Sequence, residues 1–328
     1  MLNFCTLFDS HYLSRGLAMY QSLKKHCPDF HLYIFPFDLV SHEILIQLKL
    51  DHVTVIPMAE FETEELLRVK SSRTRGEYCW TCTPSIIHHC MSNFNLPDCT
   101  YLDADLSFFS NPQVLLDELA NDSVLITEHR YTPEYDQSET SGIYCVQFIT
   151  FKNDESGMTV LKWWRDRCIE WCFNRMEDGK FGDQKYLDDW TTRFKKVHVL
   201  QHLGGGVAPW NVQQYNLEVD ASGFRVADKS NRSVPLVFYH FHWVRFLRNY
   251  KADLGYYDLD FSNVELMYRN YLKCVLQMDQ ELEKRFQFRL KVGWESFAKE
   301  CWRVLTNIRR KIKGSYNVID LKAFTISG

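Results

Sequence analysis

Two acidic side chains stand at the end of a short apolar segment near the middle of the first half of the chain. Cys99 to Leu102 is apolar and β-prone, and Asp103 and Asp105 follow it before apolar residues resume at Leu106. Residues two apart on a strand point to the same side, so both carboxylates face one way. Buried unpaired carboxylates are costly, and their hard oxygens suit Mg²⁺ or Mn²⁺. The pair predicts a metal site that could hold a diphosphate; a surface turn with two solvated acids is the alternative.

Polar side chains later in the chain could complete such a site. His240 and His242 follow an apolar strand that ends at Tyr239, and they have the same spacing of two as the acids, so only one of them need face the metal. Asp183 and Gln184 stand at the start of a predicted helix, where a short polar side chain is either a cap or a site residue. We take both histidines as candidate metal ligands and the Asp-Gln pair as candidate site residues.

Other residues are candidates for binding phosphate or nucleotide. Arg75 lies in a polar turn and could bind an anion through two N–H groups, with a solvated basic turn as the alternative. Asp9 follows the first apolar segment and is either a helix cap or a ligand contact. A glycine-rich loop lacks the Gly-Lys-Ser/Thr of a Walker loop, but its flexible backbone could lie close to a phosphate or sugar. Its glycines are Gly204, Gly205 and Gly206.

The elements that must position these residues alternate between strands and helices. Apolar segments and helical periodicity predict strands over 2–8, 31–37 and 52–56, with helices over 12–26 and 41–50 between them. Short connections of this kind are typical of a parallel sheet covered by helices, where ligands bind beyond the carboxyl ends of the strands. Asp9, Asp38 and Asp103 all stand just past predicted strand ends. We expect an α/β domain over residues 1–260 and a C-terminal helical extension over 261–328.

Further elements follow the same reasoning. Pro at a first helical turn predicts a helix over 84–93, and a second helix opens within 179–190. The polar, turn-rich segment 128–141 lies next to the proposed metal site and could be an acceptor-binding lid. Residues 280–313 interleave apolar side chains with Lys and Arg and end in a basic run. This run could dock on an anionic membrane, with a solvated helix as the alternative.

Composition excludes some classes of protein. The 328 residues are 45% hydrophobic and 24% charged, which is ordinary for a globular chain, and the formal charge of -4 does not suggest a nucleic-acid binder. The first residues do not resemble a signal peptide, and no window reaches the roughly 18 apolar residues that span a bilayer. The eleven cysteines show no zinc or disulfide pattern. We therefore expect reduced thiols and a cytoplasmic protein. Binding to the inner face of the membrane through the basic run is a further possibility.

Five stretches in order resemble one family, the retaining GT-A-fold glycosyltransferases related to bacterial lipopolysaccharide galactosyl- and glucosyltransferases and to glycogenin. The chain is also similar to bacterial proteins described as nucleotide-diphospho-sugar transferases. The resemblance covers about residues 1 to 245, and five ordered motifs are more specific than any one of them. The stretches are Phe8 to Leu23, Tyr101 to Asp105, Phe181 to Leu187, His202 to Gly206 and Phe238 to His242.

The resemblance implies a GT-A sheet, mixed but mostly parallel and flanked by helices, and a role for each matching residue. It implies that Asp103 and Asp105 hold Mn²⁺ or Mg²⁺ and, through it, the donor diphosphate, and that His242 or His240 completes the metal site. It also implies a nucleotide-sugar donor, with UDP favoured, and a glycan or lipid-linked acceptor. The other implied contacts are Phe8, Asp9 and Arg15 to the nucleotide, Asp183 and Gln184 to the donor sugar, and Gly204, Gly205 and Gly206 to the donor phosphates.

The chain departs from the family pattern at two places. The usual Asn-x-Gly on the acceptor side is replaced by the stretch from Tyr144 to Gln147. The late histidine is followed by Trp243 rather than Gly and Lys, so the cation for the diphosphate is Arg75, Arg245 or Lys185. Two other functions stay open from the residues alone. One is an aspartyl-phosphate phosphatase, which also ends a strand in Asp-x-Asp, and the other is a non-catalytic nucleotide-sugar-binding module.

Overall fold

The computed structural model describes residues 1–247, 250–289, 306–312 and 315–322. At its centre lies a seven-stranded sheet in which every neighbouring pair is parallel except the two pairs that β7 makes. This confirms the fold class that the resemblance implies, a GT-A-type sheet, mixed but mostly parallel. In spatial order the strands are β3 (Val53–Val55), β2 (Phe30–Pro36), β1 (Leu2–Phe8), β4 (Asp98–Leu102), β7 (Tyr144–Lys152), β6 (Val124–Glu128) and β8 (Val197–Val199).

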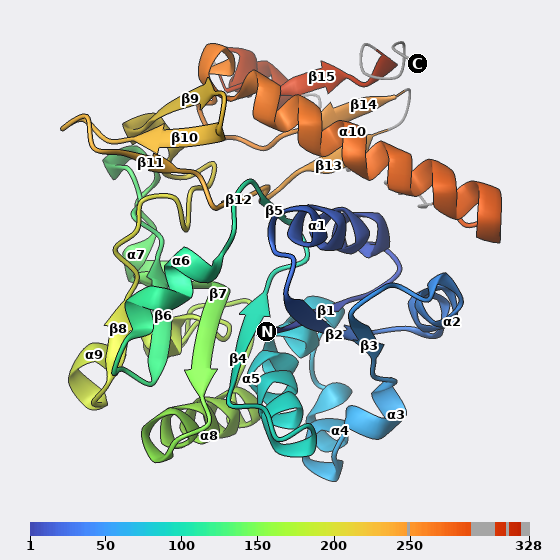
Figure 1. Cartoon of the computed structure of the whole chain (residues 1–328), viewed down its shortest axis with the longest axis vertical. Helices are drawn as coiled ribbons and strands as arrows, with labels where there is room; N and C mark the ends of the chain where they lie inside the picture. The colour runs from blue at the N-terminus through green and yellow to red at the C-terminus, as the bar shows by residue number, and fades with distance from the viewer. Residues whose placement is uncertain (248–249, 290–305, 313–314, 323–328) are drawn as a thin grey trace.

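Helices cover both faces of this sheet, as predicted, and each face has its own apolar core. Figure 1 shows α5 and α8 below the sheet and α1 above it, with α10 lying across α1. The two cores are the reason that the strands are apolar on both sides. The helices of the upper core are α1 (Leu13–His26), α2 (Leu39–Leu48), α6 (Gln113–Leu116) and α10 (Phe261–Phe286), and those of the lower core are α3 (Met58–Phe61), α4 (Glu64–Lys70), α5 (Arg75–Asn93), α8 (Glu155–Glu170) and α9 (Trp190–Arg193).

Helix α5 begins nine residues before the predicted start at Pro84. Thr74 caps it, and its Oγ1 accepts the Glu77 N–H while a Glu77 carboxylate oxygen accepts the Thr74 N–H, which makes a complete capping box. Proline removes one helical N–H, and threonine hydroxyls in the preceding turn hydrogen-bond to helix carbonyls. The predicted polar turn is therefore the first half of a helix, and Arg75 is its first residue.

Two predicted features near the site are only partly confirmed. The segment 179–190 forms no long helix but a single 3-10 turn, Lys185–Leu187, before α9 begins. The polar segment 128–141 contains two short turns of helix, Pro133–Tyr135 and α7 (Ser138–Ser141). Before β6, α6 (Gln113–Leu116) is followed by the 3-10 turn Asp117–Leu119.

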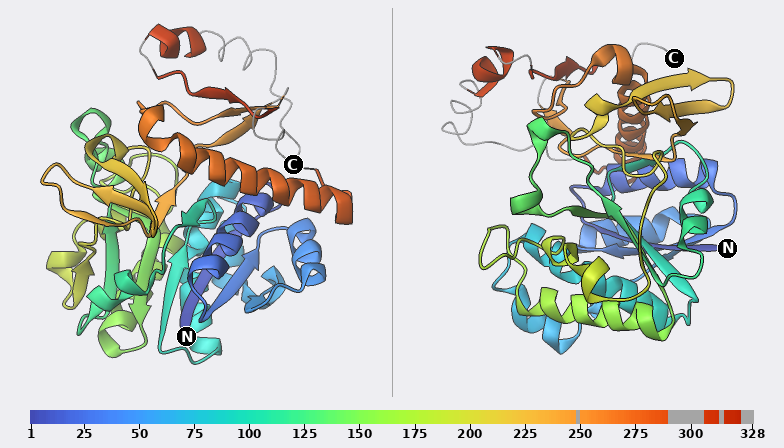
Figure 2. Two further views of the ribbon diagram at one scale, coloured as in Figure 1. Left: turned by 45° about the horizontal axis from the view of Figure 1, so that its top comes forward. Right: turned by 90° about the vertical axis from the view of Figure 1, so that its left-hand side faces the viewer.

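Three small sheets stand above the central sheet (Figures 1 and 2). In one of them β5 pairs antiparallel with β12, and this pairing matters most for the site. A 3-10 turn, Val212–Gln214, precedes the second small sheet. The sheets consist of β5 (Leu106–Phe108) with β12 (Phe238–His240), of β9 (Asn216–Asp220), β10 (Gly223–Ala227) and β11 (Ser233–Pro235), and of β13 (Arg245–Leu247), β14 (Lys251–Asp253) and β15 (Val318–Asp320).

The C-terminal extension is tied closely to the rest of the chain. Helix α10 packs over α1, and β15 pairs with β14 across the predicted boundary at residue 260, which stays a prediction. Within the predicted basic run, Arg310 is buried and bonds to both carboxylate oxygens of Asp253 at 2.8 and 2.9 Å. One positive charge of the basic run is therefore buried and paired with an acid of the same chain. Most of the interleaved segment, residues 290–305, lies outside the described residues.

Two further observations concern the cysteines and the helices. The ten cysteines within the described residues are free thiols. Among the helices that the structure describes, none combines the length and the apolar character needed to cross a bilayer.

Candidate active site

The chain makes a turn where β4 leaves the central sheet, with the Leu106 N–H bonded to the Asp103 oxygen at 3.3 Å, and this turn presents both acids. The Asp103 N–H still bonds to the Gln147 backbone oxygen at 3.0 Å, so the first acid is fixed to β7. Asp105 is fixed from the other side, because its backbone oxygen accepts the Phe241 N–H at 2.9 Å. Strand β5 then pairs with β12 in a register that sets His240 opposite Leu106. This register brings a residue from late in the chain to the predicted pair of acids.

Asp103, Asp105 and His240 form one cluster, whose possible ligand atoms all lie within 4.8 Å of one another. His240 Nε2 lies 3.0 Å from Asp105 Oδ1 and 3.8 Å from Asp103 Oδ2. The side chains of His240 and Asp105 are only 6% and 12% exposed, whereas that of Asp103 is 29% exposed. A ligand could therefore reach the cluster from the Asp103 side.

The electrostatics of this cluster show a surplus of negative charge. Burial, together with the neighbouring Asp105, raises the pKa of Asp103 to about 6 despite the opposing effect of His240. Burial also opposes ionisation of Asp105, but His240 outweighs it and lowers the pKa of that carboxyl to about 2. In the part of the chain that the structure describes, neither acid forms an ion pair with a lysine or arginine. Two carboxylates and an imidazole fit a divalent cation such as Mn²⁺.

His242, the other candidate ligand, stands apart from this cluster. Its ring centroid lies 5.6 Å from that of His240 and 5.4 Å from that of Trp210. Burial and the neighbouring His240 lower the pKa of His242 to about 4. The structure thus brings His240, and not His242, to the two acids. The strand register places His240 at the acids, and its binding of a metal stays a prediction.

Two neighbours of the cluster were not predicted as site residues. The Tyr101 hydroxyl donates a hydrogen bond to Asp103 Oδ1 at 2.9 Å, and Gln147 Oε1 lies 2.7 Å from His240 Nδ1. Tyr101 precedes Asp103 by two on β4, so strand alternation could have identified it. Gln147 was noticed only as a departure from the family pattern.

The Asp183–Gln184 pair divides between two places. Asp183 is buried, and burial followed by the charge of Asp103 raises its pKa to about 8. Its backbone oxygen accepts the Trp164 Nε1–H at 2.8 Å, which fixes it to α8. The Gln184 amide instead donates to the Ser141 backbone oxygen at 2.6 Å. Gln184 therefore holds the segment that was predicted to be an acceptor lid, whereas Asp183 is affected by the charge of Asp103.

A second group of polar residues lies at the carboxyl ends of β1 and β2. Arg75 Nη1 is 2.9 Å from Asp9 Oδ2, and Arg75 Nη2 is 3.5 Å from Asp38 Oδ2. Asp38 also caps α2 through the Ser41 N–H and accepts two hydrogen bonds from Ser10. Arg75, predicted to bind a phosphate, is thus already paired with two carboxylates of its own chain.

Two residues predicted to touch the nucleotide have structural partners. The Phe8 side chain is buried against Gly16, where an added Cβ would stand 2.4 Å from the Phe8 ring. The Arg15 guanidinium is buried and donates to the backbone oxygens of His11 and Val244 at 3.0 and 2.9 Å. Both residues shape the first turn from within, and a direct contact of their side chains with nucleotide stays a prediction.

The glycine-rich loop is packed into the protein, and its predicted contact with the donor phosphates stays a prediction. All three glycines are buried. A Cβ at Gly204 would stand 2.1 Å from the Pro235 oxygen, and one at Gly205 would stand 2.6 Å from Leu200. Here glycine allows other parts of the same chain to approach the loop closely. Gly206 has a positive φ of 84°, and a Cβ there would stand 2.8 Å from Thr127 Cγ2 and 3.5 Å from Gln147 Nε2.

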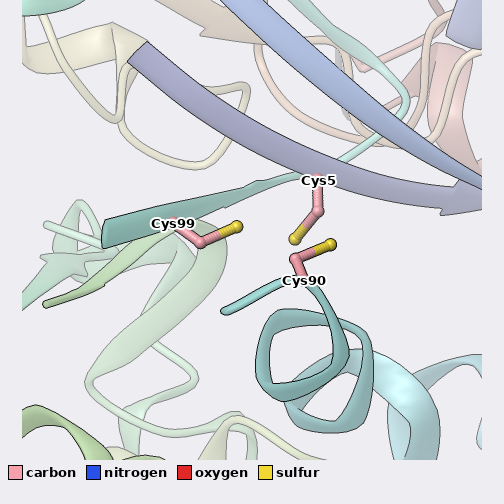
Figure 3. A group of neighbouring side chains, drawn as sticks. All are labelled: Cys5, Cys90 and Cys99. Atoms are coloured by element: carbon pink, nitrogen blue, oxygen red, sulfur yellow. The ribbon is translucent and has the colours of Figure 1, made fainter. Parts of the chain in front are cut away.

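Three thiols form a further group that could hold a metal, on the side of the sheet toward α5. Figure 3 shows Cys5, Cys90 and Cys99 with their sulfurs turned toward one another, and all three are fully buried. Burial raises the pKa of Cys5 and of Cys90 well above its usual range, which keeps these thiols protonated. A structural zinc site takes four ligands, and the described residues supply three here. We regard the group as core packing.

No protein-family model matches the chain. Among solved structures, mouse xyloside xylosyltransferase 1 in its apo form is 14% identical, with 74% of this chain and 98% of that chain covered and a TM-score of 0.46. The galactosyltransferase LgtC, in complex with donor and acceptor sugar analogs, is 11% identical, with coverages of 84% and 96% and a TM-score of 0.48.

Two curated proteins of Bacillus subtilis (strain 168) match nearly the whole chain. The uncharacterized protein YfnD is 31% identical over 296 residues, which span 87% of this chain and 92% of YfnD. The uncharacterized protein YfnF is 31% identical over 293 residues, which span 86% of this chain and 95% of YfnF. The chain therefore belongs to the family of YfnD and YfnF.

Proposed function

We propose that the chain is a metal-dependent glycosyltransferase that moves a sugar from a nucleotide-diphosphate sugar, with UDP the favoured nucleotide, to a hydroxyl of a glycan or lipid-linked acceptor. The observation that carries the proposal is the cluster of Asp103, Asp105 and His240, whose carboxylates have no lysine or arginine partner among the described residues. The order of the family motifs supports it. Synthesis of cell-surface polysaccharide or lipopolysaccharide is the role we propose.

The residues of the cluster fit the metal that such a transfer uses. Asp103, Asp105 and His240 would hold Mn²⁺ or Mg²⁺, which when bound supplies Lewis-acid stabilisation of the charge on the leaving diphosphate. Tyr101 orients Asp103 through its hydroxyl. The partial exposure of Asp103 leaves the donor diphosphate a way to approach.

The group at the ends of β1 and β2 supports a place for the nucleotide. Asp9 and Asp38 are oriented by Arg75, and the side chain of His11 is 60% exposed beside Asp9. Carboxylates fixed in this way can accept hydrogen bonds from ribose hydroxyls or base N–H groups. Ligands of open α/β sheets bind at this edge. We therefore assign the base and ribose to Asp9 and its neighbours.

One of the three candidate cations for the diphosphate is best placed to bind it. Arg75 is paired with two acids, and Lys185 Nζ lies 2.7 Å from Asp188 Oδ2 and donates to the Ser138 oxygen at 2.7 Å. Arg245 stacks on Trp243 at 4.2 Å and has no ion pair within the residues described. A stacked guanidinium keeps its N–H groups for an anion. We assign the diphosphate to Arg245.

We propose that the transfer retains the anomeric configuration. The bond from the anomeric carbon to the phosphate oxygen breaks, and a bond from the acceptor oxygen to the same carbon forms on the same face through an oxocarbenium-like state. The acceptor proton passes to the departing phosphate. Asp183, which is close enough for the charge of Asp103 to raise its pKa, orients the donor sugar. A product with inverted configuration would end this part of the proposal.

Release of nucleoside diphosphate tests the proposed function. A panel of UDP-, GDP- and ADP-sugars is incubated with the protein in Mn²⁺ or in chelator, beside Asp105→Asn and a Thr150→Val control. We expect metal-dependent release from one donor, lost in Asp105→Asn and kept in the control. Phosphate release from simple phosphomonoesters instead would indicate a phosphatase. Nucleotide binding without release from any donor, with a range of glycan acceptors supplied, would indicate a binding module.

Peripheral membrane contact and a cytoplasmic location stay proposals. The basic run at 309–313 supplies positive charge for an anionic surface, although Arg310 is buried against Asp253. Flotation of the protein with anionic vesicles, with and without residues 306–328, measures the contact. Equal behaviour of both forms would remove it.

A further inference from the structure

Gln147 is a polar residue in the middle of the buried strand β7. Its side chain is fully buried, and all the remaining residues of the strand from Tyr144 to Phe151 are buried as well. Gln147 contacts the metal cluster twice. Its backbone oxygen accepts the Asp103 N–H at 3.0 Å, and its Oε1 lies 2.7 Å from His240 Nδ1.

The chemistry of the amide determines which nitrogen of His240 is available. An amide oxygen can only accept a hydrogen bond, so the His240 Nδ1 that faces it carries the proton. In the neutral ring the lone pair then lies on Nε2, the nitrogen 3.0 Å from Asp105. Partners of this kind orient metal-binding histidines and raise their affinity for the ion.

The other half of the amide shows that Gln147 is a poor choice for stability alone. Gln147 Nε2 is buried and has no hydrogen-bond partner within the described residues. A buried donor without a partner costs free energy of folding, whereas an apolar side chain of similar size would leave no such donor in the strand. A functional role therefore explains Gln147 at this position better than a contribution to stability does.

We propose that Gln147 is a positioning residue, which holds His240 with Nε2 toward Asp103 and Asp105 and so sets the affinity of the cluster for its metal. This inference rests on the metal site of the proposed function and names a residue that supports it. The contact between Gln147 and His240 needs no substrate, so its effect on metal binding is measurable without donor sugar or acceptor.

Direct binding of Mn²⁺ to the full chain, measured by electron paramagnetic resonance of the free ion, tests the inference. Gln147→Met keeps the approximate size and removes the acceptor, and we expect its affinity to fall by about 10- to 100-fold. Gln147→Glu keeps an acceptor oxygen and should stay close to wild type. Thr150→Val removes a buried hydrogen bond to Thr100 on the same strand and should leave Mn²⁺ affinity unchanged.

Thermal unfolding without metal separates positioning from folding. Gln147→Met removes the unpaired Nε2 donor of Gln147 but leaves the Nδ1–H of His240 without its acceptor. Because these two effects on stability oppose each other, we expect a small change of Tm beside a large loss of Mn²⁺ affinity. Unchanged affinity in Gln147→Met, or an equal loss in Gln147→Glu, would overturn the inference and leave the proposed function standing. A wild-type chain that binds no Mn²⁺ would overturn both.

Discussion

At the edge formed by β1 and β2, Arg75 stands between Asp9 and Asp38, whereas at the end of β4 the ion-pair partner of Asp103 and Asp105 among the described residues is a histidine. Both pairs follow strands of one sheet, and both belong to groups that could hold a metal. The first pair is neutralised by a guanidinium from helix α5.

The second pair has no such partner in the described chain, and burial makes its charge harder to hold. The raised pKa of Asp103 expresses that cost, since its burial and the nearby Asp105 disfavour a second negative charge. Coulomb energy is large where water is excluded. The difference teaches that two acids at the carboxyl ends of strands are not enough to indicate a metal. The absence of a fixed cation is the stronger sign.

The largest expected effect comes from removing one charge of the unpartnered pair. Asp103→Asn should lower metal-dependent release of nucleoside diphosphate at least about 100-fold, which is the scale of losing one group that stabilises developing charge. The same change should leave the Tm of the metal-free protein unchanged or higher, because a carboxylate disfavoured by burial is replaced by an amide. Turnover assays and thermal unfolding measure the two effects. A large fall in Tm would contradict the comparison.

A carboxylate that is satisfied by the backbone should behave in the opposite way. Glu77 accepts the N–H groups of Thr74 and Asn174, both at 2.7 Å. Burial opposes ionisation, but these hydrogen bonds lower its pKa. Glu77→Gln should cost about 1.5–3 kcal/mol of unfolding free energy at neutral pH, the range for hydrogen bonds to a charged group.

The pH dependence of that cost has a definite sign. Because the pKa of Glu77 is lower in the folded state, its contribution is present above the usual glutamate pKa and is lost as pH falls through the folded value. Urea unfolding of both forms should converge toward acid pH. A gap that stays constant down to pH about 3 would show that the charge is not the cause.

The smallest effect on stability is expected at the neutralised edge. Arg75 is 52% exposed, and Arg75→Gln should cost less than about 1 kcal/mol of unfolding free energy. The change leaves Asp9 and Asp38 without their cation, so we expect a second, weak Mn²⁺ site to appear there. Binding stoichiometry measures it. If the variant still bound a single ion with no weaker second site, a fixed cation would not be what separates the two edges.

Much of the fold could be predicted from the sequence, because in its first elements the apolar pattern and the residues at the element ends indicate the same structure. Strand β1 has the predicted bounds, and the elements from α1 to β3 differ from their predicted bounds by no more than two residues at either end. Apolar segments that end in polar caps define them. The start of α5 was missed because Pro84 resembles a first turn, although Thr74 and Glu77 form the capping box that begins the helix nine residues earlier.

The candidate site could be predicted only in part, because several of its contacts depend on tertiary structure. Asp103 and Asp105 follow from a strand end, but the choice of His240 over His242 depends on the register of β12 against β5. Gly204 illustrates a different limit. Glycines that let backbones pack closely look the same in sequence as glycines that admit a phosphate, and only the neighbouring Pro235 distinguishes them.

The most direct test of the proposed metal site is the number of Mn²⁺ ions bound by the wild-type chain and by two matched variants. Asp103→Asn alters the unpartnered pair, and Asp38→Asn alters the pair that Arg75 neutralises. Equilibrium dialysis should find one ion on the wild type, one on Asp38→Asn and none on Asp103→Asn. An ion that is lost only in Asp38→Asn, or no ion on the wild type, would contradict a metal site at the end of β4.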